Sequence, residues 1–536
     1  MCHLAAAAAK AVSGVRMAPG YAAGSPGQVA TATFVQDVTL YRRRGWRLST
    51  STSKGHVVTH HVVDPFMPAV ELAAAIRRKE VSPVEVVDCY LDRIDELDPQ
   101  LNAFCHRADD DVRKAAAAAA DAVARTASGD DLPPFHGVPL PIKDLLDVAG
   151  WPTTYGSAAT ARVPATASAP IVQRLVDAGF LPFGKTTTSE FGAVSFTESA
   201  ALGITRNPWD PHRSPGGSSS GAGAAVAAGM APIAHGADGG GSIRVPASCN
   251  GLVGLKPTRG MVTNDVVEDE GFATNGVLTR TVADTAAAMD VLARHDPAAW
   301  WSPPTPQRSF VDALAAAPPS GLRVGVLVDP PIDGLEVDPA CVRAVDATLR
   351  TLESRGHHVV DVPLPLPPAD ELVAAFTAIW NVGAAGIPLA DPDQVEPHNR
   401  ALRAAARAID SWSYAESVRK TQQFSRRIVE AFVAEFDVLV TPTMACLPPA
   451  IGLGQVGEGD DPLTPMMRSY PLAVFTSVFN VTGQPAISLP VHHDEATGLP
   501  VGVQLVAAPW REDLLLQLSQ DLEQAYQWTE RRPGVR

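Results

Sequence analysis

The chain has 536 residues, 46% of them hydrophobic, which is enough to bury a large core. Its formal net charge of −15 at pH 7 argues against a nucleic-acid binder, which would need a basic face, and against docking on an anionic membrane surface. Six cysteines are scattered without a Cys-x-x-Cys pair, and no apolar run approaches the ~20 residues of a membrane helix. We therefore expect a cytoplasmic protein with free thiols, no metal site and no cofactor.

Residues 1–60 differ from the rest of the chain. They hold an alanine run, a Gly/Pro/Ser-rich stretch, three consecutive arginines and a Ser/Thr tract, without sustained periodicity. This composition predicts a disordered extension ahead of a folded domain at residues 61–536. A signal peptide is disfavoured because Lys10 interrupts an already short apolar region. A later translation start, for example at Met67, stays open.

From residue 65 onward, the hydrophobic pattern predicts helices that alternate with strands. Ser82-Pro-Val-Glu85 is a capping box that starts one of these helices. Helices are expected at residues 67–78, 82–97, 110–127, 169–177, 219–228, 339–355 and 513–526. Apolar strands are expected at residues 137–142, 180–183, 321–328, 435–440, 486–489 and 501–507. The alternation predicts an α/β fold whose strands are covered on both faces.

A further stretch, residues 363–430, has a mostly helical pattern. We expect it to form a helical cap over the functional site. Its aromatic side chains Phe376, Trp380 and Trp412 are candidates for contacts with a ligand, although the sequence assigns none of them to a pocket.

Gly179-Phe-Leu-Pro-Phe-Gly-Lys-Thr186 satisfies the phosphate-loop pattern G-x-x-x-x-G-K-S/T. The chemistry does not fit, because Phe-Leu-Pro-Phe is an apolar segment that favours burial and its proline lacks an N–H group. We therefore predict a buried core strand here and no nucleotide site.

Gly217-Ser-Ser-Ser-Gly221 satisfies G-x-S-x-G, with Ser219 as the nucleophile of a Ser–Asp–His hydrolase. Such a nucleophile elbow needs a strand directly before it, whereas residues 207–215 are too rich in proline to form one. The late histidines lie in polar sequence and are expected at the surface; they are His357, His358, His398, His492 and His493. We therefore reject Ser219 as the nucleophile.

Three segments carry the residue types of a serine hydrolase that needs no histidine. Gly239–Gly241 place an unobstructed backbone before Ser242, and glycines let successive N–H groups converge on one oxygen, as an oxyanion hole requires. Lys143 lies among apolar residues, and burial favours the neutral amine that can act as a base. Ser218 can then relay a proton between Lys143 and Ser242. The alternative interpretation is a flexible Ser/Gly linker and a surface lysine, although a linker rarely leads straight into an alanine-rich helix.

These segments carry a resemblance to a known family. Ser214-Pro-Gly-Gly-Ser-Ser-Ser-Gly-Ala-Gly-Ala-Ala-Val-Ala-Ala-Gly229, Asp238-Gly-Gly-Gly-Ser-Ile-Arg-Val-Pro-Ala247 and Gly251-Leu-Val-Gly-Leu-Lys-Pro-Thr258 resemble the signature of the amidase signature family. The resemblance extends from Leu140-Pro-Ile-Lys-Asp144 to Asn480-Val-Thr-Gly-Gln-Pro-Ala-Ile-Ser-Leu-Pro490 and covers nearly everything after residue 65. It implies a single large domain in which a mixed, twisted β-sheet is sandwiched between α-helical layers.

The resemblance implies a Ser–cis-Ser–Lys triad. Its nucleophile falls on Ser242, its cis-serine on Ser218 and its lysine on Lys143. The Gly217–Ser218 peptide bond is then expected to be cis.

The resemblance also assigns supporting residues. Asp238 and Arg244 match a pair that is expected to brace the loop rather than to react. The chain departs from the family at Gly239, where threonine is common, and at Ala222, where a second glycine is common. Loss of the threonine side chain is expected to loosen the loop or to open space for a substrate. The expected oxyanion-hole donors are the backbone N–H groups of Gly239, Gly240, Gly241 and Ser242.

The implied activity is hydrolysis of a small-molecule carboxylic amide with a linear C–N bond, or of an ester, through an acyl-enzyme. No cofactor, metal, nucleic acid or membrane is expected as a partner, and a homodimer stays open. Residues 483–515 resemble the branch that contains aminohexanoate cyclic-dimer hydrolases.

Two alternatives remain. One is the A subunit of a tRNA-dependent amidotransferase, which needs partner subunits; the chain lacks the Ser-rich segment expected there after Arg259. The other, from a different class, is a catalytically silent binding protein.

Overall fold

The computed structural model describes residues 47–53, 56–263, 269–303, 305–332 and 334–535. The predicted disorder of residues 1–46 lies outside the described residues and stays a prediction. Further along the predicted extension, β1 (Arg47–Ser53) pairs with β2 (His56–Val62) as an antiparallel hairpin, where the sequence predicted no regular structure. Threonine and valine recur in this segment, and both residue types favour strands.

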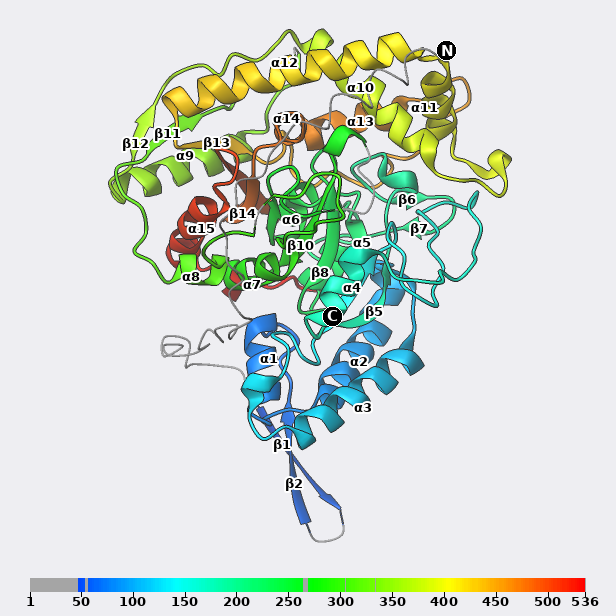
Figure 1. Ribbon diagram of the computed structural model, residues 1–536, viewed down its shortest axis with the longest axis vertical. Helices are drawn as coiled ribbons and strands as arrows, with labels where there is room; N and C mark the ends of the chain where they lie inside the picture. Colours follow the sequence, from blue (N-terminus) through cyan, green and yellow to red (C-terminus); the bar gives the residue numbers. More distant parts are fainter. Residues whose placement is uncertain (1–46, 54–55, 264–268, 304, 333, 536) are drawn as a thin grey trace, which may run out of the picture. The chain divides into compact units, whose positions relative to one another are not determined.

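Among the described residues, the largest sheet has eight strands in the order β12-β11-β13-β15-β14-β9-β10-β8 (Figure 1). Strand β11 pairs in parallel with β12 and β13, and the other neighbouring pairs are antiparallel, so the sheet is mixed. The strands are β8 (Ala234–Asp238), β9 (Val253–Lys256), β10 (Thr274–Thr279), β11 (Arg323–Val326), β12 (His358–Val360), β13 (Val438–Pro442), β14 (Ala486–His493) and β15 (Pro500–Ala507).

Side chains alternate between the two faces of this sheet, as the two-residue period of a strand requires. One face packs against α7 (Val282–Leu292), α9 (Pro339–Ser354) and α15 (Glu512–Tyr526), through Val438, Val440, Ile487, Leu489, Val503 and Leu505. The intervening residues Leu439, Ala486 and Val506 belong to a second cluster with helices on the other side. The predicted α/β fold, with a mixed sheet between helical layers, is confirmed.

A smaller sheet with the order β3-β5-β4 lies in the N-terminal half of the domain. Its strands are β3 (Phe104–His106), β4 (Pro139–Lys143) and β5 (Leu181–Thr186). Strand β5 contains residues 181–186 of the phosphate-loop match, and both Phe180, directly before the strand, and Phe183 are 2% exposed. The predicted buried strand is therefore confirmed. A two-residue pair, β6 (Glu198–Ser199) and β7 (Gly203–Ile204), follows.

Helices of the N-terminal half surround these strands. Helix α2 starts with the predicted capping box, in which Ser82 accepts from Val84 and Glu85 accepts from the backbone of Ser82. The α-helices of this half are α1 (Ala69–Arg77), α2 (Pro83–Leu101), α3 (Asp109–Arg125), α4 (Pro170–Asp177), α5 (Ser220–Ala227) and α6 (Arg244–Asn250).

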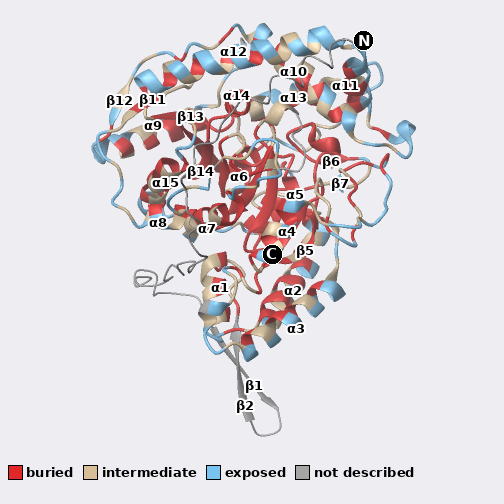
Figure 2. Ribbon diagram, viewed as in Figure 1, coloured by how far each residue is buried: buried red, intermediate tan, exposed pale blue. Residues whose placement is uncertain are grey.

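The stretch at residues 363–430 is helical, as predicted. Its helices are α10 (Ala369–Gly386), α11 (Pro397–Ala408) and α12 (Ser411–Glu435). Helices α10 and α12, together with α14 (Ser477–Thr482), supply most of the second hydrophobic cluster. In Figure 2, α12 carries exposed residues in pale blue, whereas the central strands are buried. The other helices of this half are α8 (Phe310–Leu314) and α13 (Thr464–Ala473). In the described part of the chain, no helix is both long enough and apolar enough to cross a membrane.

Two of the histidines expected at the surface are buried. His357 is 4% exposed and its Nδ1 accepts the backbone N–H of Leu322 at 3.3 Å, beside the start of β11. His398 is 5% exposed on α11. The polar local sequence around both residues gave no information on the distant segments that cover them, so the prediction was wrong for this pair.

Asp284→Asn should flatten the dependence of stability on pH. Asp284 is buried on α7, and its Oδ1 accepts the N–H of Val70 at 2.9 Å. Burial raises the pKa of this carboxyl from 3.8 to about 6, so between these values the folded chain binds more protons than the unfolded chain. Stability therefore falls as pH rises through that window, by on the order of 1–3 kcal/mol for this group.

Urea denaturation at about pH 4 and about pH 7 measures this effect. The loss of stability toward neutral pH should be smaller in Asp284→Asn than in the wild type. Equal losses in the two proteins would show that Asp284 does not titrate in this range.

Candidate active site

Lys143 lies at the end of β4 and is 1% exposed. Its Nζ donates to Ser218 Oγ at 2.8 Å and to the backbone carbonyl of Ala237 at 3.2 Å. Burial lowers the pKa of the Lys143 ammonium from 10.5 to about 7, and the negative charge of Asp238 opposes that shift. A large share of this amine is therefore neutral at neutral pH and can accept a proton.

Ser218 lies just ahead of α5, and the Gly217–Ser218 peptide bond is cis, as the family resemblance implied. The neighbouring Ser219 donates its hydroxyl to the carbonyl of Ala237 at 3.3 Å, the same carbonyl that accepts from Lys143 Nζ. Residues 205–217 contain an isolated bridge at Arg213 and no strand. The structure therefore lacks the elbow that Ser219 would need as a nucleophile.

Ser242 lies in the loop between β8 and α6 and is 8% exposed. Asp238, the last residue of β8, shapes this loop: its Oδ1 accepts the N–H of Gly241 at 2.8 Å, and its Oδ2 accepts the N–H of Ile243 at 3.2 Å. Gly241 has a φ of +135°, and a Cβ on it would lie 2.9 Å from the Cβ of Thr476. Only glycine fits at this position.

The bond from Gly241 changes the expected set of oxyanion donors. Its N–H group points to Asp238 and is not free to receive charge from a substrate. Gly239, Gly240 and Ser242 remain from the expected set. A charged carboxylate is a strong acceptor, which explains why it captures the N–H group closest to it.

The contact between Lys143 and Ser218 lies beside β8, the strand that leads to the loop of Ser242. Lys143 contacts both Ser218 and Ala237, the residue directly before Asp238, and the tight loop to Ser242 begins there. Among the described residues, the hydroxyl of Ser242 has no hydrogen-bond partner. The structure therefore contains the Lys143–Ser218 contact of the expected relay. Within the described residues it contains no hydrogen bond between Ser218 and the hydroxyl of Ser242.

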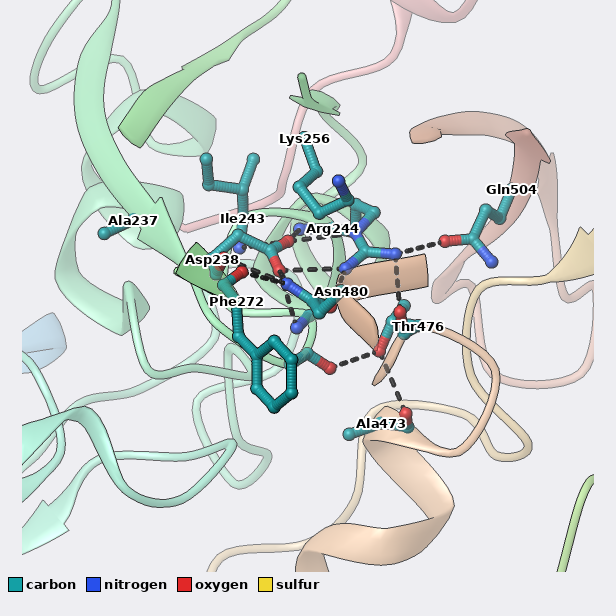
Figure 3. A network of polar contacts seen from close by, with 12 residues as sticks. Ala237, Asp238, Ile243, Arg244, Lys256, Phe272, Ala473, Thr476, Asn480 and Gln504 are labelled. Atoms are coloured by element: carbon teal, nitrogen blue, oxygen red, sulfur yellow. Dashed lines mark hydrogen bonds and ion pairs between the residues drawn. The ribbon is translucent and has the colours of Figure 1, made fainter. Parts of the chain in front are cut away.

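Asp238 and Arg244 form a fully buried ion pair beside this loop (Figure 3). The guanidinium donates to both carboxylate oxygens, at 2.8 Å from Nη2 and 2.9 Å from Nε. Burial alone would raise the pKa of the Asp238 carboxyl, but Arg244 outweighs burial and holds that pKa well below its ordinary value. The other donors of Arg244 bind three further acceptors, the carbonyl of Thr476 and the side chains of Gln504 and Asn480.

The sequence analysis did not predict a buried histidine in contact with the backbone of Lys143. His235 on β8 accepts the backbone N–H of Lys143 at its Nδ1, 3.4 Å away, and its Nε2 lies 3.0 Å from the Oδ1 of Asn275. Burial lowers the pKa of His235 to about 4, and the positive charges of Lys143 and Lys185 add to the shift. The imidazole is therefore neutral and joins β4 to β8.

A second buried lysine was also missed. Lys185 forms a 2.6 Å ion pair with Asp144, and both side chains are at most 1% exposed. Both lysines lie on buried strands, and the family resemblance assigned the triad lysine to Lys143 and no role to Lys185. The contact with Ser218 distinguishes Lys143, because Lys185 is occupied by a carboxylate.

A family profile described as Amidase matches residues 85–516, which is more than half of the chain. The chain belongs to the amidase signature family. This amidase-family enzyme is 35% identical over 495 residues to the 6-aminohexanoate-cyclic-dimer hydrolase of Paenarthrobacter ureafaciens, with 88% of this chain and 97% of that protein covered. It is 36% identical over 477 residues to a putative amidase of Synechocystis sp., with 87% and 90% covered.

This amidase-family enzyme is also similar to solved structures of amide hydrolases. A structure of 6-aminohexanoate cyclic dimer hydrolase matches with a TM-score of 0.80 and 34% identity, covering 88% of this chain and 99% of that one. A bacterial aryl acylamidase of the amidase signature family matches with a TM-score of 0.77 and 27% identity, covering 87% and 99%.

The structure corrects one expectation about Gly239. A glycine at this position was expected to loosen the loop or to open space. A Cβ built on Gly239 would lie 2.8 Å from Cζ3 and 3.1 Å from Cη2 of Trp380, so the indole already fills that space. Of the other aromatic candidates in residues 363–430, Phe376 lies near Gly240, whereas Trp412 is 78% exposed.

Proposed function

We propose that this enzyme hydrolyses carboxylic amides, with esters as further substrates, through an acyl-enzyme on Ser242. The observation that carries the proposal is the buried amine of Lys143, 2.8 Å from Ser218 Oγ, with a pKa that burial lowers to about 7. A serine hydroxyl attacks a carbonyl only when a base takes its proton, and a neutral buried lysine can supply that base.

In the proposed reaction, Lys143 Nζ accepts the proton of Ser218 Oγ, and Ser218 Oγ accepts the proton of Ser242 Oγ. The Ser242 oxygen bonds to the carbonyl carbon while the π electrons move to the carbonyl oxygen. The N–H groups of Gly239 and Gly240, with that of Ser242, receive this charge. The oxygen electrons then re-form the C=O bond as the C–N bond breaks, and the nitrogen takes the proton back through Ser218 and leaves as an amine, which leaves the acyl group as an ester on Ser242. Water then gives a proton to the same relay and attacks the carbonyl carbon of the Ser242 ester. The ester bond breaks, Ser242 regains its proton, and the carboxylic acid is released.

Asp238 and Arg244 have a bracing role in this proposal. Both carboxylate oxygens of Asp238 already accept hydrogen bonds, and the guanidinium of Arg244 is distributed over four partners. A buried pair with this many partners fixes the loop that carries Ser242 and leaves no free site for proton exchange.

The substrate is proposed at the level of the amide class. The sequence predicts a linear C–N bond, and the names of the relatives add a cyclic amide dimer and an aryl acylamide to the candidates. We also propose a cytoplasmic location, which the scattered free thiols predict.

A panel of amides tests the proposed function. The purified chain alone is incubated with a primary amide, an anilide, a linear aliphatic amide and the cyclic dimer of 6-aminohexanoate, and released ammonia or amine is measured. The wild type should hydrolyse at least one of them and Ser242→Ala none. Ser219→Ala, which removes the adjacent hydroxyl of the rejected motif, should stay active. Turnover only with added partner subunits and tRNA would favour the amidotransferase alternative.

The value of kcat/KM should rise with pH to a plateau, with its midpoint at about 7. Below the pKa of about 7, Lys143 is an ammonium and cannot accept the proton of Ser218. Above it, the amine is neutral and the rate no longer depends on pH. The profile is measured on an uncharged amide, so that the substrate does not titrate. A rate that falls as pH rises through neutrality would show that the protonated amine is the active form.

A further inference from the structure

Two aromatic side chains of α10 lie against the glycine loop that carries Ser242. A Cβ on Gly239 would lie 2.8 Å from Trp380 Cζ3, and a Cβ on Gly240 would lie 3.7 Å from Phe376 Cζ. Phe376 and Trp380 are four residues apart, so they project from the same face of the helix. The indole of Trp380 therefore stands where the side chain of residue 239 would otherwise lie.

A stack of aromatic rings fixes the indole in this position. The rings of Phe272 and Phe376 lie 5.4 Å apart at an interplanar angle of 3°, and those of Phe376 and Trp380 lie 5.4 Å apart at 20°. The stack is also tied to the buried ion pair, because the Asn480 amide donates to the carbonyl of Phe272 at 3.0 Å and to Asp238 Oδ1 at 2.9 Å (Figure 3). Trp380 therefore has little freedom to turn away from the loop.

We propose that Trp380 is a specificity-determining residue, whose ring is the wall against which the acyl group of the substrate packs. This inference rests on the proposed function, in which Ser242 and the N–H groups of Gly239 and Gly240 fix the carbonyl next to this wall. Trp380 and Phe376 are both partly exposed, whereas the indole Nε1 of Trp380 is itself buried. An aromatic face offers apolar contact area and no partner for a polar group. The wall therefore selects amides with a flat or extended apolar acyl group over those with a small or polar one.

The test compares kcat/KM for hexanoyl anilide and acetyl anilide, which share one leaving group. The wild type should prefer the hexanoyl substrate, and Trp380→Leu should reduce the hexanoyl-to-acetyl ratio by about tenfold. Trp380→Phe, which keeps an aromatic ring, should reduce it less. Trp412→Ala removes an exposed indole from the same cap and should leave the ratio unchanged.

The outcomes separate this inference from the proposed function. A wild type that hydrolyses neither anilide nor any amide of the panel would overturn the proposed function and this inference with it. An active wild type with an unchanged ratio in folded Trp380→Leu would overturn this inference alone. Hexanoyl anilide and hexanamide share one acyl group, and a Trp380→Leu effect that appears between these two substrates instead would overturn the assignment to the acyl group.

A double-mutant cycle tests the contact itself. Gly239→Ala should lower kcat/KM for both anilides by about 10- to 100-fold, because the new methyl group meets the indole and displaces the loop. Gly239→Ala combined with Trp380→Leu should recover most of that loss, since the indole is gone. General damage to the loop would give no such recovery. A folded double variant as slow as Gly239→Ala would contradict the proposed contact, and the Trp380 series gives the answer if Gly239→Ala does not fold.

Discussion

Replacing Lys143 by alanine should abolish amide hydrolysis and leave the protein folded. The value of kcat/KM is expected to fall by at least about 10³-fold, because removing one member of a catalytic triad removes most of the rate enhancement of all three. Folding should survive because, within the described residues, the Nζ of Lys143 bonds only to Ser218 Oγ and the carbonyl of Ala237. Its removal also relieves the cost of burying an amine. Steady-state kinetics and a thermal melt on the same sample measure the two effects.

Two variants control this experiment. Lys143→Met keeps the length of the side chain and should be as inactive as the alanine variant, which excludes a cavity as the cause. Lys256→Met removes another buried lysine whose pKa burial also lowers to about 7, but whose Nζ donates to the carbonyl of Pro257. It should lose far less activity. Unchanged turnover in folded Lys143→Ala would exclude the proton-transfer scheme.

Arg244→Met should cause the largest loss of stability. The substitution leaves the carboxylate of Asp238 fully buried without its counter-ion, and it deprives the acceptors on Asn480 and Gln504 of a donor. Removing one partner of a buried ion pair costs about 3–5 kcal/mol of the free energy of unfolding. The midpoint of urea denaturation measures the loss, and activity should fall with it because the loop of Ser242 loses its brace.

An exposed ion pair provides the contrast. Arg426 and Glu430 lie 2.8 Å apart on α12, with 80% and 62% of their side chains exposed. Arg426→Ala should change the free energy of unfolding by less than about 1 kcal/mol, because water screens such a pair. If Arg244→Met were as mild as Arg426→Ala, the buried pair would not be the brace of the loop.

Much of the fold could be predicted because the signals are local. The capping box at Ser82 fixed the start of α2, and apolar runs located the strands around Val438 and Leu505. Strand order could not be predicted, since β13 pairs with β15 across more than sixty residues of sequence. Burial of His357 was missed for the same reason: its partner, the N–H of Leu322, lies 35 residues away.

The candidate site also depends on contacts that the sequence could not predict. The resemblance placed Lys143, Ser218 and Ser242 in one site, and the contact between the first two is present in the structure. It could not show that Gly241 gives its N–H to Asp238, since a pattern of glycines contains no hydrogen-bond partners. The space beside the loop was misjudged because Trp380 comes from a distant helix with no family motif.

The most direct test of the Ser242 mechanism is covalent labelling by a fluorophosphonate, followed by intact-mass measurement and peptide mapping. An activated serine displaces fluoride from phosphorus and keeps the label. The wild type and Ser219→Ala should each carry one adduct, on Ser242, with a labelling rate that rises with pH through about 7. Ser242→Ala should stay unlabelled, and Lys143→Ala should label at least about 10³-fold more slowly. An adduct on Ser218 or Ser219, or an unlabelled wild type, would contradict the account.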